Sequence, residues 1–179
     1  MKGIVFTEFI EMVEKQFGYE MIDKIILSSD LKSGGAYTTV GTYDHKEMST
    51  LVHALSTRTN IPVAQLYKIY GNYLFKILYK NYPFLFEKST NAFEFLEGID
   101  NHIHIAVKKL YPDAELPNFE ITRLSNNVLE MIYHSERKMS DFADGLIEGA
   151  LEHFQEKATV QKELLVEDGS KAKFIISKV

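Results

Sequence analysis

The chain has 179 residues, of which 45% are hydrophobic and 25% are charged, enough for one compact domain with a substantial core. It contains no cysteine, which excludes disulfides, thiolate zinc sites, iron–sulfur clusters and cysteine nucleophiles, and a cytoplasmic location is the simplest expectation. The net charge of −5, with no block of Lys or Arg, argues against a nucleic-acid partner, and no run of about 18 apolar residues is present to span a membrane.

Apolar residues at helical spacing cover most of the first half of the chain. The pattern predicts helices over residues 4–17, 21–26, 44–58, 63–81 and 93–111, and a later one over 139–156. Gly18 and Pro83 supply stop signals, and Asp44 with Glu47 has the spacing of a capping box. The glycine-containing stretch 28–43 lacks the Gly-Lys-Ser/Thr of a phosphate loop and is predicted to be an ordinary loop.

After Pro117 the pattern changes from helices to strands. Strands are predicted over residues 119–123, 128–137, 159–166 and 172–178. The last two flank Asp168-Gly169, a strong hairpin signal. Helices first and then ββαββ predicts an α+β fold, in which a layer of about six to seven helices packs on a four-stranded antiparallel sheet.

Two histidines, His102 and His104, flank the apolar stripe of the predicted 93–111 helix. Residues two apart on an α-helix point about 200° away from each other, so the two rings cannot bind one ion together. The plainer interpretation is two boundary residues, and the sharper one is a single axial ligand to a haem iron; periodicity does not choose between the rings. Asp100 lies four residues before His104, but such pairs are common on helices and a joint metal site is discounted.

Tyr133, Ser135 and Arg137 alternate along the predicted 128–137 strand. Alternate residues share one face of a strand, roughly 6.6–7 Å apart, so three hydrogen-bond donors would form a row. Such a row suits two carboxylates on flexible arms, as in the haem propionates, and the plainer alternative is a polar face open to solvent.

Together these residues resemble the haem nitric oxide/oxygen binding family, H-NOX, which includes the haem domain of soluble guanylate cyclase and bacterial gas sensors. The resemblance covers the whole chain, and its most specific motif is Tyr-x-Ser-x-Arg, here Tyr133, Ser135 and Arg137, which in the family binds the haem propionates. The resemblance also chooses between the histidines, because His104 rather than His102 matches the proximal iron ligand.

The resemblance implies one haem-binding domain over residues 1–179, with a distal helical part over 1–60, a proximal part with the sheet over 61–179, and haem b buried between them. It implies that Pro117 presses on the haem face. No zinc site of the kind some relatives build with cysteines is expected.

The distal side of the haem is expected to be apolar. The matching positions are Val5, Phe9, Leu74, Leu78, Phe142 and Leu146. Oxygen-binding relatives carry a Tyr where this chain has Phe142. A hydrogen bond to a charged group contributes about 1.5–3 kcal/mol, so a pocket without a donor favours nitric oxide over oxygen.

The resemblance therefore implies a stand-alone sensor that binds nitric oxide, and carbon monoxide, at ferrous haem. With 179 residues no output domain is expected, so the signal would pass to a partner, a histidine kinase or a cyclic-di-GMP enzyme. The alternatives are a haem-free interaction scaffold and, less in keeping with the distal residues, an oxygen sensor. An enzyme is not expected, because no distal acid–base group or catalytic triad stands out. The other histidines, His45, His53, His134 and His153, are expected on the surface or on helix faces.

Overall fold

The structure is a computed structural model that describes residues 1–179. Its helices are α1 (Gly3–Phe17), α2 (Tyr19–Leu27), α3 (His45–Thr59), α4 (Val63–Asn81), α5 (Ala92–Glu97), α6 (His104–Leu110) and α7 (Ser140–His153), with a 3-10 turn η1 (Pro83–Leu85) and a π-helical turn η2 (Ile99–Ile103). Its strands are β1 (Asn118–Ser125), β2 (Val128–His134), β3 (Ala158–Leu164) and β4 (Lys171–Lys178). None of the helices combines the length and the apolar character needed to cross a membrane.

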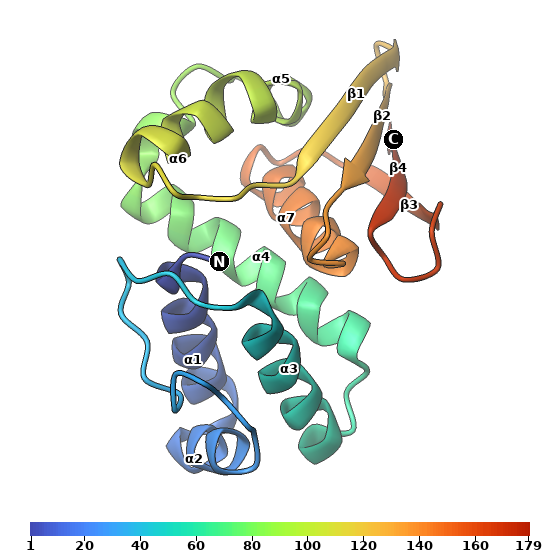
Figure 1. Cartoon of the computed structure of the whole chain (residues 1–179). Helices are drawn as coiled ribbons and strands as arrows, with labels where there is room; N and C mark the ends of the chain where they lie inside the picture. Colours follow the sequence, from blue (N-terminus) through green and yellow to red (C-terminus); the bar gives the residue numbers. More distant parts are fainter.

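The four strands form one antiparallel sheet in the order β1-β2-β4-β3, with α7 inserted between β2 and β3. One face of the sheet is buried, because alternate residues of β2 and β4 are apolar and point the same way. These buried residues are Leu129, Met131, Tyr133, Ala172, Phe174 and Ile176. Figure 1 shows α7 between the sheet and α4. The predicted α+β fold, with its helical layer on a four-stranded antiparallel sheet, is confirmed.

Two apolar cores lie on either side of the long helix α4, which crosses the middle of the molecule (Figure 1). The first core packs α1, α2, α3 and the first part of α4, and the second packs the end of α4 with α5, α7 and the sheet. The change occurs inside α4, between Leu74 and Phe75. Helix α4 therefore contributes to both halves of the molecule.

Glycines let α4 and α7 touch along their backbones. A Cβ atom on Gly71 would lie 2.2 Å from the carbonyl oxygen of Phe142, and one on Gly145 would lie 2.0 Å from that of Lys68. Either methyl group would force the helices apart. This close crossing brings the residues that follow Gly71 on α4 next to Phe142 on α7.

The predicted 93–111 helix is not continuous. It is divided into α5, the π-helical turn η2 and α6, and the N–H of Ile103 donates to the carbonyl of Gly98 at 3.2 Å, five residues back. A π-turn holds one residue more than an α-turn, and apolar periodicity over so short a stretch does not register it. His104 is the first residue of α6, immediately after this turn.

The second strand is shorter than predicted. Strand β2 ends at His134, so Ser135 and Arg137 lie in the turn that leads to α7 rather than in a row with Tyr133. The turn requires a left-handed residue, Lys138, with φ of 59°, which the extended conformation of a strand excludes. The prediction that strand geometry aligns these three side chains is therefore wrong.

The capping box predicted at α3 is only half formed. Asp44 caps the helix by accepting the N–H of Lys46 at 3.0 Å. Glu47 is buried and accepts hydrogen bonds from Ser33 and from the hydroxyl of Tyr37, at 2.7 Å for Tyr37, in place of reaching back to the cap. Its carboxylate thus anchors the 28–43 loop to α3.

Candidate functional site

A largely apolar cavity of about 260 Å³ lies where α4, α6, α7 and the end of β2 meet the start of the chain. Of its 31 lining residues, 25 are hydrophobic. Most of the predicted site residues line it: Val5, Leu74, Leu78, His104, Pro117, Tyr133, Ser135, Arg137, Phe142 and Leu146. Residues far apart in the sequence thus line one cavity, from Val5 in α1 to Leu146 in α7.

Two of the residues singled out in the sequence lie elsewhere. Phe9 is fully buried in the first core, where its ring packs edge-on against Tyr70 at 5.2 Å between centroids. His102 is exposed and does not line the cavity. His104 is therefore the histidine that the cavity contains.

The ring of His104 is held at one of its two nitrogens. Its Nδ1 atom lies 2.7 Å from Oδ1 of Asp100, and the side chain is only 17% exposed. Burial lowers the pKa of His104, with the Asp100 carboxylate opposing that shift. The contact at Nδ1 leaves Nε2 as the ring nitrogen whose lone pair can bind a metal.

Asp100 connects His104 to the sheet. Its Oδ2 atom accepts the backbone N–H of Phe119 at 2.9 Å, at the start of β1. Its Oδ1 atom is buried and makes no well-aligned hydrogen bond, so the imidazole of His104 is the polar group placed to satisfy it. The i,i+4 spacing signalled this pair, but as an orienting contact through Nδ1 rather than a joint metal site.

Three donors gather at the end of β2. The hydroxyl oxygen of Tyr133 accepts the N–H of Met139 at 3.2 Å, and burial raises the pKa of this phenol. The hydroxyl of Ser135 accepts the N–H of Arg137 at 3.2 Å. In each of these two bonds the hydroxyl oxygen is the acceptor, so neither bond uses the hydroxyl proton.

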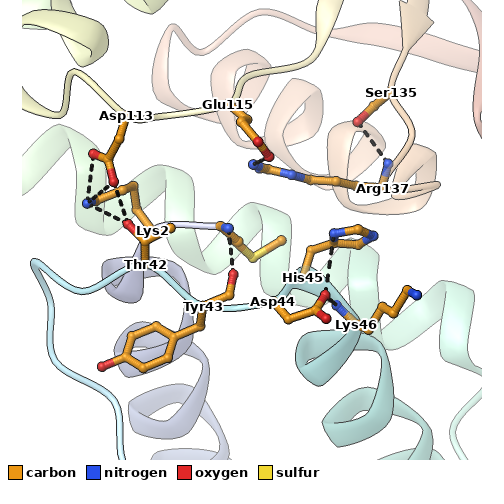
Figure 2. Close-up of polar contacts among 11 residues, drawn as sticks. Lys2, Thr42, Tyr43, Asp44, His45, Lys46, Asp113, Glu115, Ser135 and Arg137 are labelled. Atoms are coloured by element: carbon orange, nitrogen blue, oxygen red, sulfur yellow. Dashed lines mark hydrogen bonds and ion pairs between the residues drawn. The ribbon is translucent and has the colours of Figure 1, made fainter. Parts of the chain in front are cut away.

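The guanidinium of Arg137 already attracts a carboxylate. Its Nη2 atom lies 3.5 Å from Oε2 of Glu115, as Figure 2 shows. Arg137 is 16% exposed and Glu115 is 85% exposed, so the pair joins a held cation to a solvated anion. A surface pair of this kind contributes little stability and can be displaced by another carboxylate.

The predicted distal residues that line the cavity are all apolar, so their side chains contribute no hydrogen-bond donor to its wall. The ring of Phe142 packs on Tyr70, with centroids 5.2 Å apart. Tyr70 is fully buried and its hydroxyl donates to the backbone carbonyl of Val5, so that proton is already engaged. Burial raises the pKa of Tyr70 well above its usual range, which keeps it protonated.

Two phenols in the cavity wall were missed in the sequence. Tyr82 and Tyr111 both line the cavity, and their hydroxyls share a hydrogen bond of 3.1 Å. Tyr82 is the residue after α4, four residues after Leu78 and eight after Leu74, and this continuation of the apolar spacing is a signal that was available.

The donors suit a haem better than a bare metal ion. No group of three or more His, Cys, Asp or Glu side chains comes together anywhere in the structure, and a lone imidazole does not complete the four protein ligands of a typical zinc site. A porphyrin brings four nitrogens of its own and needs one axial ligand. An apolar cavity with His104 in its wall, a buried acceptor behind that ring and carboxylate-binding donors at one end fits such a group.

Comparison with known proteins agrees with this chemistry. A family model described as Haem-NO-binding matches residues 2–162. Among solved structures, the Fe(II) unliganded H-NOX protein from K. algicida is 45% identical, with a TM-score of 0.96 over 100% of this chain and 97% of that one. An H-NOX protein from S. oneidensis in the Fe(II)NO state is 28% identical, with a TM-score of 0.92 over 100% and 99% of the two chains. The H-NOX from Shewanella woodyi in the Fe(II)CO state, bound to IWP-051, is 39% identical, with a TM-score of 0.83 over 100% and 95%.

One curated relative is a larger protein. Soluble guanylate cyclase 89Da from Drosophila melanogaster is 25% identical over 140 residues, which are 76% of this chain. The match spans only 20% of the length of that protein.

Proposed function

Because the chain belongs to the haem-NO-binding family, whose H-NOX members are haem-based gas sensors, we propose that it is a cytoplasmic sensor that binds nitric oxide at a ferrous haem b and signals to a separate effector protein. We further propose that residues 1–179 form a single haem-binding domain, with a distal helical part over 1–60 and a proximal part over 61–179. When bound, the haem supplies the ferrous iron that takes up nitric oxide or carbon monoxide.

The observation that carries the proposal is one cavity that contains a single, oriented imidazole and a separate cluster of carboxylate donors. His104 would hold the haem iron through Nε2, and Asp100 holds its ring. Tyr133, Ser135 and Arg137 are the proposed partners of the propionates, with Pro117 against the haem face.

The proposed preference for nitric oxide over oxygen follows from the distal wall. Val5, Leu74, Leu78, Phe142 and Leu146 have no hydrogen-bond donor in their side chains. A bound oxygen molecule gains negative charge and would lose about 1.5–3 kcal/mol of hydrogen bonding in such a wall. Nitric oxide, which bonds to ferrous iron with less charge transfer, loses less.

The proposed output is a change in the segment that carries His104. In this proposal, His104 would link the iron to α6, and a partner protein would detect a movement of α6. A histidine kinase or a cyclic-di-GMP enzyme is the proposed partner, and binding rather than catalysis is the proposed activity of this chain.

The test is hemin uptake by the purified chain and by His104→Ala. The wild-type protein should take up hemin and give, after reduction, distinct absorption spectra with carbon monoxide and with nitric oxide. The variant should lose haem, and added imidazole should restore it by replacing the missing ring. No hemin uptake by the wild type, or normal haem in the variant without imidazole, would contradict the assignment. In air, a long-lived oxygen complex of the ferrous wild type would contradict the distal argument.

A further inference from the structure

The segment that follows α6 is tied to the rest of the molecule at two successive points. The first is Tyr111, the residue after α6, which shares the 3.1 Å hydrogen bond with Tyr82, the residue after α4. Figure 1 shows the end of α4 beneath α6. One hydrogen bond thus joins the end of the helix with His104 to the end of the helix with Leu74 and Leu78.

The second tie is at Asp113, two residues later. The ammonium of Lys2 lies 3.1 and 3.2 Å from the two carboxylate oxygens of Asp113 and also donates to Thr42 Oγ1 and to the carbonyl of Val40, each at 2.9 Å. Thr42 in turn donates to Asp113 at 2.6 Å, as Figure 2 shows. The same ammonium lies 5.4 Å from the centre of the Tyr111 ring, so Lys2 contacts both points.

Lys2 is much less exposed than a typical surface lysine of this chain. Its side chain is only 12% exposed, whereas Lys15, which pairs with Glu11 one turn away, is 55% exposed. Its backbone is fixed as well, because Lys2 forms a β-bridge with Thr42. A glycine is required at the next position, because a Cβ atom on Gly3 would lie 1.7 Å from the carbonyl oxygen of Thr38. The ammonium is therefore held in place by its hydrogen bonds and by the fixed backbone beside it.

Helix α6 has few other attachments: Asp100 contacts His104, and the partly buried Ala106 packs against the second core. None of its seven residues is fully buried, and the same is true of the five residues of η2. A short helix without a buried apolar face is marginal on its own and belongs to the low-stability part of a protein. The polar ties at its end therefore add to the few contacts that hold α6.

We propose that Lys2, Tyr82, Tyr111 and Asp113 form a clasp that resists movement of α6 away from α4, and so sets how readily His104 leaves the haem iron when nitric oxide is bound. This inference rests on the proposed function. Tyr82 and Tyr111 act as positioning residues in it, because they hold the helix that carries His104 without touching the imidazole. The hydrogen bond with Tyr111 is the main reason that the pKa of Tyr82 is raised to about 12, so Tyr82 keeps its proton over the whole physiological range.

The first measurement is amide hydrogen exchange over residues 104–113, in the full chain with and without hemin. Tyr82→Phe and Tyr111→Phe each remove one hydroxyl and keep the ring, so each should speed local opening about two- to tenfold, the effect of losing one hydrogen bond. The double variant should be no faster than either single variant, because both changes remove the same bond. The control is Tyr79→Phe, whose hydroxyl lies on the same helix and makes no hydrogen bond in the structure.

The second measurement is spectroscopic, and it would not change if these residues only stabilised the fold. In the reduced, haem-loaded protein, the rate at which the bond between His104 and iron opens after addition of nitric oxide is followed by absorption. It should rise by a similar two- to tenfold in Tyr82→Phe and in Tyr111→Phe, and remain at the wild-type value in Tyr79→Phe. Lys2→Met, which keeps the alkyl stem and removes the ammonium, should shift both measurements in the same direction and serves if a Tyr variant fails to fold.

Two results would overturn the clasp. One is unchanged exchange in 104–113 in the single variants, or effects that add in the double variant. The other is faster exchange with an unchanged rate of His104 release. A wild-type chain that takes up no hemin would instead overturn the proposed function, and the exchange measurement on the hemin-free chain would still show whether the tie between α4 and α6 exists.

Discussion

Asp100 shows how a single side chain can set the properties of another. It contacts His104 with one oxygen and the backbone of Phe119 with the other, so the imidazole is fixed relative to the sheet. A carboxylate at Nδ1 also increases the electron density that Nε2 can offer to a metal. The position of the imidazole is thus determined as much by β1 as by α6.

Replacing Asp100 with Asn should therefore weaken haem binding without removing His104, the proposed iron ligand. The amide can still accept the N–H of Phe119, but its charge is lost, and loss of such an outer contact typically costs about 10- to 100-fold in metal affinity. The rate of hemin transfer to a competing haem-binding protein should rise accordingly, and the iron–His104 stretching frequency in the ferrous protein should fall. Asp23→Asn, on the exposed face of α2, is the matched control. An unchanged frequency would show that Asp100 only supports the fold.

For single residues, the sequence predicted which side chains line the cavity better than it predicted what each side chain does there. The motif residues Tyr133, Ser135 and Arg137 and the choice of His104 came from a resemblance, and the structure brings all four to one cavity. The role of Asp100 could not be predicted, because an i,i+4 pair on a helix does not show which atom of the ring it reaches. The partner of Tyr82 could not be predicted either, because Tyr111 is 29 residues away.

Among the elements, α7 carries a histidine that packs against aromatic rings, one of them on α4. His153, the last residue of α7, lies 4.0 Å from the ring centre of Tyr79 and 4.7 Å from that of Phe154, and Phe86 lies 5.8 Å away. Burial lowers the pKa of His153. An imidazole that resists protonation inside this cluster couples the attachment of α7 to pH.

The stability of the protein should consequently fall in acid, in part through His153. Its unfolded pKa is about 6.5 and its folded pKa is lower, so its stabilising contribution is present above the unfolded value and is lost as the pH falls through the folded value. His153→Phe keeps an aromatic ring and cannot titrate, so its melting temperature should drop less than that of the wild type between about pH 7.5 and 5.5. His53→Gln, on α3, is the control. Parallel melting curves for wild type and His153→Phe would contradict the coupling.

The elements themselves were largely predictable. Long apolar stripes such as that of 63–81 gave α4 (Val63–Asn81) almost to the residue, since Pro62 and Pro83 bound it. The failures lie where a local conformation depends on distant partners. The turn after His134 depends on Ser170, whose carbonyl accepts the N–H of Ser135 at 2.9 Å, and no pattern within 128–137 reports that contact.

On the scale of the whole molecule, the two cores meet at the cavity. The first core contributes Leu74 and the second contributes Tyr133, and residues of both line the same walls. The order of helices and strands was enough to predict an α+β fold, because each element buries one face. The division between the cores inside α4 could not be predicted, because the buried residues on either side of it belong to one continuous apolar stripe.

Removing the haem should therefore destabilise the whole chain rather than one part of it. A ligand that binds only the folded state adds about 2.7 kcal/mol when present at 100 times its dissociation constant, which for a chain of this size raises the melting temperature by about 5–10 °C. Thermal unfolding followed by circular dichroism, with and without hemin, measures this difference. His104→Ala should lose most of the increase. Equal melting temperatures for the loaded and the hemin-free wild type would exclude a haem that bridges the two cores.

The hydroxyl oxygen of Tyr133 accepts the N–H of Met139, the residue immediately before α7, and α7 carries Phe142 and Leu146 into the cavity. The phenol proposed to bind one propionate of the porphyrin thus also fixes the start of α7, the helix that forms part of the cavity wall. Anchoring the cofactor and shaping the space for a gas molecule are consequently not separable traits in this protein, and selection acting on either one is constrained by the other.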